Sequence, residues 1–269
     1  MTGVRSRVAS WFCILDGKAS AFQLSSGTVL QAIGGESGLV TALHESYLTL
    51  QQAYSLTYPD EQRKGDEEQL PLLERMLRLP VLLHEITQLK HTPREDEGAS
   101  QRLVQLREKL DAHRDAIQEL AETGVFHGLS RARSTFLVLS ALYNAVEVSF
   151  SRSLYPGLPR HAAGNCARTI IKLAQELTHL QTTNFRASRD TPPPTKFWPL
   201  PLVMAAIEVD DIIYREWAID RLRAYEKVGG DHYVYATKFV TLVCAAEDKA
   251  MARVDWEPIM ATVRDGLTI

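Results

Sequence analysis

The sequence predicts an all-α fold, in which one large domain over residues 1–269 is built of amphipathic helices around a central apolar helix. Two observations predict this fold. Apolar residues recur every three to four positions in nearly every patterned segment. No segment sustains the alternation of polar and apolar residues that a half-buried strand shows. The chain is 45% hydrophobic and 23% charged, which is ordinary for a soluble globular protein.

The expected helices follow one another along the chain. Segment 37–56 carries leucines and tyrosines on one side, and segment 100–120 has leucines on one face and charged residues on the other. Segment 70–89 is rich in leucine, and Pro80 within it predicts a kink or a division into two helices. Further helices are expected over residues 161–182, 199–209, 211–228, 231–248 and 256–264.

Segment 130–154 is the expected central helix. It is apolar on most sides, and a helix that is apolar nearly all round is normally buried. The residues that give it this character are Phe136, Leu139, Leu142, Tyr143, Val146 and Phe150.

Four loops are expected, over residues 31–37, 58–66, 92–98 and 183–197. The last contains three consecutive prolines, which cannot lie in a helix interior. We therefore expect segment 183–197 to be a surface crossing between two halves of one helical domain. Gly229 and Gly230 are typical of a helix C-terminus.

The composition narrows the function classes. A net charge of −3 without a basic block argues against direct binding of nucleic acid. Cys13, Cys166 and Cys244 are far apart, so we expect no thiolate metal site and a reducing, intracellular, cytoplasmic setting. No stretch approaches the roughly 20 apolar residues of a membrane span.

An acid pair, Asp210 and Asp211, resembles the DDxxD magnesium motif of ionising terpene cyclases. The stretch here is DDIIY, so Tyr214 stands where the third acidic ligand belongs. The favoured interpretation is structural: one acid caps the following helix, and Asp211 pairs with Arg215 one turn later. His84-Glu85 likewise fails as HExxH because residue 88 is Gln. No motif for a metal or a cofactor is therefore predicted.

Polar residues inside the expected central helix are the candidate catalytic groups. Asn144 and Glu147 share one face with Ser151, and Tyr143 is adjacent. A buried Glu147 must be paired or protonated, which is how carboxylic acids are prepared for proton transfer. A purely structural hydrogen-bond network is the other interpretation, and both stay open.

Four further residues are candidates for binding a substrate. A cavity rimmed by Trp198, Met204, Tyr214 and Trp217, together with Tyr143, would suit an apolar ligand. The alternative is that these side chains are ordinary core residues.

Residues 197–222, FWPLPLVMAAIEVDDIIYREWAIDRL, resemble the regulatory domain of fungal zinc-cluster transcription factors. Those domains carry Trp-Pro-Leu, small and apolar residues, Ile-Glu, one or two acids, an arginine, and a tryptophan that opens the next helix. WFCILDGKASAF near the start and SRSLYPGLPRHAAGNCARTIIKLAQEL also resemble that domain, so the likeness covers most of the chain in outline. The matching positions are Trp198, Pro199, Leu200, Ala205, Ala206, Ile207, Glu208, Asp211, Arg215 and Trp217.

The resemblance implies an all-helical domain that senses ligands or partners. The six-cysteine zinc cluster of those regulators and the basic segment next to it do not occur in these 269 residues. Sequence-specific DNA binding is therefore not carried over, and the family supplies no catalytic residues.

Two functions remain. The first is a repurposed stand-alone domain of fungal secondary metabolism. It would bind an apolar small molecule and catalyse a cofactor-free cyclisation, isomerisation or pericyclic cycloaddition, since holding a flexible substrate in a reactive conformer supplies much of the rate. The second is a ligand-sensing or dimerising regulator domain, nuclear in location, without its own DNA-binding segment. A homodimer is open under both, and neither involves a membrane.

Overall fold

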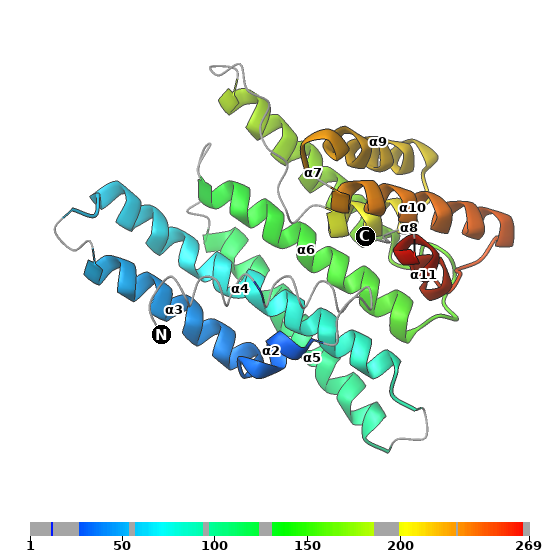
Figure 1. Ribbon diagram of the computed structural model, residues 1–269, viewed down its shortest axis with the longest axis horizontal. Helices are drawn as coiled ribbons and strands as arrows, with labels where there is room; N and C mark the ends of the chain where they lie inside the picture. Colours follow the sequence, from blue (N-terminus) through cyan, green and yellow to red (C-terminus); the bar gives the residue numbers. More distant parts are fainter. Residues whose placement is uncertain are drawn as a thin grey trace. The chain divides into compact units, whose positions relative to one another are not determined.

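The computed structural model describes residue 12 and residues 27–53, 57–93, 97–123, 131–185, 199–229 and 231–265. Helices α2 to α11 lie in these ranges, and no strand does (Figure 1). The all-α prediction is therefore confirmed.

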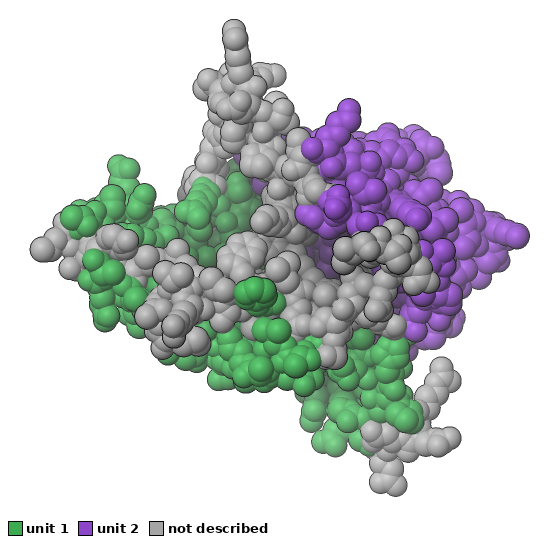
Figure 2. Space-filling view, in the orientation of Figure 1, with its two compact units in different colours: residues 1–139 green, residues 140–269 purple. Residues whose placement is uncertain are grey.

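The chain divides into two compact units, residues 1–139 and residues 140–269 (Figure 2). The boundary falls inside helix α6, Arg131–Leu154, which therefore contributes to both units. The expected single domain over 1–269 stays a prediction.

Unit 1 is built of α2 (Thr28–Ala32), α3 (Gly35–Ala53), α4 (Asp60–Lys90), α5 (Glu97–Thr123) and the first turns of α6. Helix α3 packs on α2 and α4, and α4 packs on α5. The leucine-rich sides of these helices supply the core, because each helix has one apolar stripe to bury. Side chains that are almost completely buried include Leu30, Leu39, Leu72, Leu79, Leu83, Ile86 and Leu110.

Gly27, which precedes α2, is required at its position. Its φ of 72° lies in the left-handed region. A Cβ atom there would stand 2.3 Å from the imidazole of His84, which is buried against it. Any other residue would therefore be strained and would displace that ring.

Unit 2 contains the rest of α6, then α7 (Gly164–Phe185), α8 (Pro199–Glu208), α9 (Ile212–Gly229), α10 (Asp231–Ala250) and α11 (Glu257–Asp265). Helix α8 is the most apolar of these, and every residue from Leu200 to Glu208 is buried. It packs on α7, α9 and α10, and α11 packs on α10. Helix α8 therefore lies at the core of unit 2.

The predicted helix positions agree with the structure, and the predicted loops agree less well. Residues 60–66 were expected in a loop but form the first two turns of α4, and α3 already begins at Gly35. A kink or a division into two helices was expected at Pro80. Helix α4 continues through both Pro71 and Pro80, so the division does not occur, and the kink stays a prediction. The proline-rich segment 183–197 lies outside the described residues from position 186 onward.

Helix α6 is apolar on most sides, as predicted. From Leu137 to Phe150 its residues are buried, except Asn144 and Glu147, which are half-buried. These two are the polar residues that the sequence singled out.

Candidate functional site

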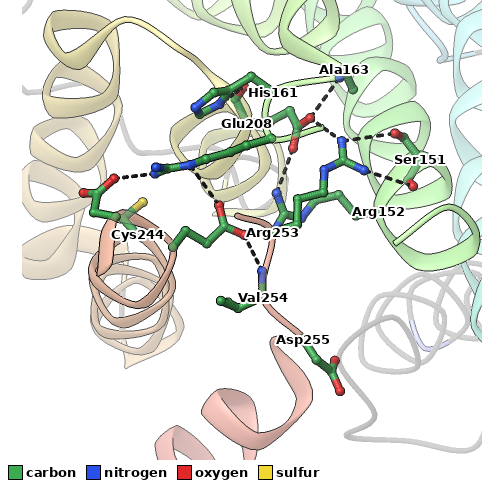
Figure 3. A network of polar contacts seen from close by, with 12 residues as sticks. Ser151, Arg152, His161, Ala163, Glu208, Cys244, Arg253, Val254 and Asp255 are labelled. Carbon is green, nitrogen blue, oxygen red and sulfur yellow. Dashed lines mark hydrogen bonds and ion pairs between the residues drawn. The ribbon is translucent and has the colours of Figure 1, made fainter. Parts of the chain in front are cut away.

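Charged side chains are concentrated in a buried network within unit 2 (Figure 3). Four arginines and three carboxylates form it, and they come from α6, α8, α9, α10 and the loops before α7 and after α10. The members are Arg152, Arg160, Glu208, Arg215, Glu247, Asp248 and Arg253.

Glu208 is the last residue of α8 and its side chain is completely buried. Its Oε2 accepts a hydrogen bond of 2.8 Å from Nη1 of Arg152, and its Oε1 pairs with Nη2 of Arg253. Oε1 also accepts the backbone N–H of Ala163 at 2.8 Å. The carboxylate therefore joins α6, the loop before α7 and the loop after α10.

Glu247 of α10 is the second completely buried carboxylate. Its Oε1 accepts from Nη2 of Arg152 and from the backbone N–H of Val254, the latter at 3.2 Å. Its Oε2 lies 3.5 Å from Nε of Arg160. Arg152 thus bridges Glu208 and Glu247, and its guanidinium also lies 5.2 Å from the ring centre of Trp256, a cation–π contact.

Asp248 is the third carboxylate and differs from the others because its side chain is half exposed. It accepts two hydrogen bonds of 3.0 Å from Nη1 of Arg215, one on each oxygen, and a further one from Nη2 of Arg160. Hydrogen bonds from Arg160 and then from Arg215 hold the pKa of Asp248 below its ordinary value, although partial burial opposes this.

Arg253 and His161 tie backbone groups to the network. Nη1 of Arg253 donates to the carbonyl oxygens of Ser151 and Tyr155 at 3.3 and 3.4 Å, at the end of α6, where each oxygen also accepts a backbone N–H. His161 has a φ of 65°, and its Nδ1–H donates to the backbone oxygen of Glu208 at 2.8 Å. A left-handed non-glycine residue is tolerated where its surroundings hold it so firmly.

The network carries one excess positive charge, because four guanidinium groups face three carboxylates. Removing one partner of a buried ion pair leaves an uncompensated charge and costs about 3–5 kcal/mol. The network is therefore expected to hold these four helices and two loops of unit 2 in one arrangement.

The predicted catalytic residues lie on α6 within unit 2. Tyr143 is buried, and its hydroxyl donates a hydrogen bond to Oε1 of Glu147 one turn later. Asn144 donates from Nδ2 to the backbone oxygen of Ser140 at 2.8 Å. Ser151, on the same face, accepts from Nη2 of Arg253 at 3.3 Å and so belongs to the network. The structure thus joins Tyr143 to Glu147, while the amide of Asn144 bonds to its own helix.

The predicted substrate-binding residues lie in different surroundings. Met204 is buried within α8, whereas Tyr214 is exposed in the first turn of α9. Trp217 is half-buried, with the guanidinium of Arg221 at 5.2 Å from its ring centre. Trp198 lies outside the described residues. The predicted aromatic rim therefore stays a prediction.

The acid pair has structural roles. Asp211 caps α9, because its Oδ1 accepts the backbone N–H of Ile213 at 2.8 Å, as predicted. Asp210 pairs with Nη1 of Arg168 at 2.8 Å. Arg215 was expected to pair with Asp211, but it turns to Asp248 instead.

The ion network does not follow from the sequence pattern. Glu208 was named only as a matching position of the family resemblance, and Arg215 as such a position and as the expected partner of Asp211. The sequence does hold a signal, since Glu208 ends an otherwise apolar ten-residue helix and a charge in such a place needs a partner. Which residues would be the partners does not follow from the pattern, because Arg152 and Arg253 are far from Glu208 in sequence.

Within the described ranges, no three His, Cys, Asp or Glu side chains gather closely enough to hold a metal ion. Among the helices in those ranges, none is both long enough and apolar enough to cross a membrane. Comparisons of the chain with protein-family models, with curated proteins and with solved structures find no match.

Proposed function

We propose that the chain binds an apolar small molecule at the polar face of α6 and catalyses a cofactor-free rearrangement of it. The reaction classes that fit are cyclisation, isomerisation and pericyclic cycloaddition. The observation that carries this proposal is the hydrogen bond from the buried Tyr143 hydroxyl to the half-buried Glu147 carboxylate, on a helix that is otherwise apolar nearly all round.

This pair has the chemistry that such a reaction needs. Glu147 can take a proton from a substrate carbon and return it to another carbon, which isomerises the substrate without a cofactor. Tyr143 orients the carboxylate by its hydrogen bond and can donate to an oxygen on which negative charge develops. The apolar walls of α6 would hold an unsaturated chain in a reactive conformer.

The experiment is a product assay. The purified protein is incubated with unsaturated linear metabolites extracted from its source organism, and products of unchanged mass are separated and quantified by chromatography and mass spectrometry. We expect faster isomer formation than in buffer, a loss of at least about tenfold in Glu147→Gln, and a smaller loss in Tyr143→Phe.

The matched control is Glu216→Gln, which removes an exposed carboxylate from α9. It should turn over like the wild type. Equal product formation by the wild type, by Glu147→Gln and by buffer would overturn the catalytic proposal.

The second candidate is a ligand-sensing or dimerising regulator domain without a DNA-binding segment. Glu208 and Arg215 favour it, because both belong to the run that resembles the fungal regulators and both lie in the buried network. Light scattering of the protein with and without the same metabolite extract tests this candidate. A ligand-dependent change of mass from monomer to dimer, without product formation, would support it.

A further inference from the structure

Asp248 is an unusual member of the buried network. Its carboxylate is exposed, yet it balances the charges of two arginines, Arg160 and Arg215, that are largely buried. Its side chain is 52% exposed, whereas those of Arg160 and Arg215 are 14% and 9% exposed. Among the residues that the structure describes, Asp248 is the one ion-pair partner of Arg215. A rotation of the Asp248 side chain into solvent would therefore uncover two guanidinium groups without moving a helix.

The two arginines have unused capacity for an anion. The network holds one more positive than negative charge. Nε of Arg215 is buried and has no hydrogen-bond partner in the part of the chain that the structure describes. Nε of Arg160 makes no hydrogen bond there either, but it faces Oε2 of Glu247 at 3.5 Å. Guanidinium groups bind carboxylates through parallel hydrogen bonds, so a second carboxylate fits this place well.

Exposed apolar side chains occur close to Arg160, Arg215 and Asp248 along the chain. Ile212 precedes Arg215 by one helical turn and is exposed, as are its neighbours Ile213 and Tyr214. Leu158 is exposed two residues before Arg160, and Met251, three residues after Asp248, is 80% exposed. Most of the large apolar side chains that unit 2 exposes in the described ranges therefore lie near Arg160, Arg215 or Asp248 in the chain.

We propose that Arg160 and Arg215 form a binding site for a small amphiphilic carboxylic acid, which Asp248 occupies when no ligand is bound. The ligand carboxylate takes the place of the Asp248 carboxylate on the two guanidinium groups, and its apolar body covers Ile212 and the neighbouring exposed side chains. Asp248 acts as an internal competitor that sets the affinity. This site uses α9 and α10 rather than the Tyr143 and Glu147 pair, so it does not rest on the proposed function.

Isothermal titration with hexanoate, at constant ionic strength, tests the proposal. Wild-type protein should bind hexanoate saturably, and Asp248→Asn should bind it about tenfold more tightly, the factor expected if Asp248 holds the arginines in about nine molecules of ten. Arg215→Gln should lose binding by at least about tenfold. Acetate, inorganic phosphate and hexanamide are the ligand controls, and each should bind more weakly than hexanoate.

The matched control variant is Asp220→Asn. Asp220 also pairs with an arginine on α9, at 2.9 Å, but both side chains are exposed. The Asp220→Asn variant should bind hexanoate with the same affinity as the wild type. Circular dichroism establishes whether each variant is folded. If Arg215→Gln is not folded, Arg215→Lys, which keeps the charge, replaces it.

Four results would overturn the proposal. The first is that neither wild type nor Asp248→Asn binds hexanoate, and the second is that the folded arginine variant binds it with unchanged affinity. The third is that acetate or phosphate binds as tightly as hexanoate, and the fourth is that hexanamide does. Tight binding of acetate or phosphate would show that the ligand's apolar body is not recognised. Tight binding of hexanamide would show that its carboxylate is not recognised.

Discussion

Glu208 is the residue on which the network depends most. It is completely buried and accepts from two arginines and one backbone N–H. We expect Glu208→Gln to lower the free energy of unfolding by about 3–5 kcal/mol, because Arg152 and Arg253 would keep buried charges without that carboxylate. Urea denaturation followed by circular dichroism measures the loss.

Asp220→Asn is the matched comparison for that measurement. It breaks an exposed ion pair with Arg223, and such pairs contribute about 0–1 kcal/mol. A loss in Glu208→Gln no larger than in Asp220→Asn would show that the network does not stabilise unit 2.

Cys244 is a second residue with a checkable environment. Its thiol donates to the backbone oxygen of Ala206 at 3.6 Å, and burial raises its pKa to about 11. The thiolate is the reactive form, so Cys244 should resist iodoacetamide at pH 8 in the folded protein and react once urea unfolds it. Peptide mapping by mass spectrometry locates the label, and rapid native labelling at Cys244 would contradict its burial.

At the scale of the elements, the start of α9 offers a direct test of the helix cap. Asp211 accepts the backbone N–H of Ile213, which has no acceptor within the helix because it lies in the first turn. Asp211→Ala should therefore cost about 1 kcal/mol of stability, while Asp211→Asn should cost less because asparagine is also a good cap. Equal losses in the two variants by urea denaturation would contradict the capping role.

The helices could be predicted because each has its own apolar stripe. For α3 and for α5 to α11, the predicted and observed bounds differ by a few residues at most. The beginning of α4 was missed because residues 60–66 are mostly charged and have no apolar stripe to reveal a helix. There the helix begins after Pro59, with Asp60 and Glu61 in its first turn, where acids favour helices.

The candidate site could be predicted only in part. Tyr143 and Glu147 were both predicted as candidate catalytic residues, and the structure joins them across one helical turn. The ion network could not be predicted, because its members are up to 101 residues apart in sequence, as Arg152 and Arg253 are. Helix periodicity carries no information on which helices contact one another. A charge within an apolar stripe, such as Glu247 following Val240 and Val243 on α10, indicates a buried partner without naming it.

At the scale of the whole molecule, the stability should depend on pH through His113 of unit 1. Burial first, and then the charges of Arg75 and Arg78, lower the pKa of His113 to about 4. The pKa of a histidine in an unfolded chain is about 6.5. The unfolded state therefore binds more protons between these two values, and stability should fall as the pH falls from about 6.5 to about 4.

His113→Gln removes that titration. Its stability should change less than that of the wild type over the same pH window, in thermal melts at constant ionic strength. An identical pH dependence in both proteins would contradict a buried neutral His113.

Carboxylates with lowered pKa values also make the stability fall as the pH falls, but at lower pH than His113 does. The pKa of Asp248 in unit 2 lies below its ordinary value because Arg160 and Arg215 donate hydrogen bonds to it. Its contribution is present above the unfolded pKa of about 3.9 and is lost as the pH falls through the lower folded value. Thermal melts below pH 4 should therefore show a weaker acid dependence in Asp248→Asn than in the wild type.

The role of α6 in function is best measured by the rate of isomer formation from unsaturated linear metabolites. Wild-type protein should form products of unchanged mass faster than buffer, and Glu147→Gln should be slower than wild type by at least about tenfold while melting at a similar temperature. If the wild type forms such products no faster than buffer, or if Glu147→Gln is as fast as the wild type, the Tyr143 and Glu147 pair is not a catalytic site.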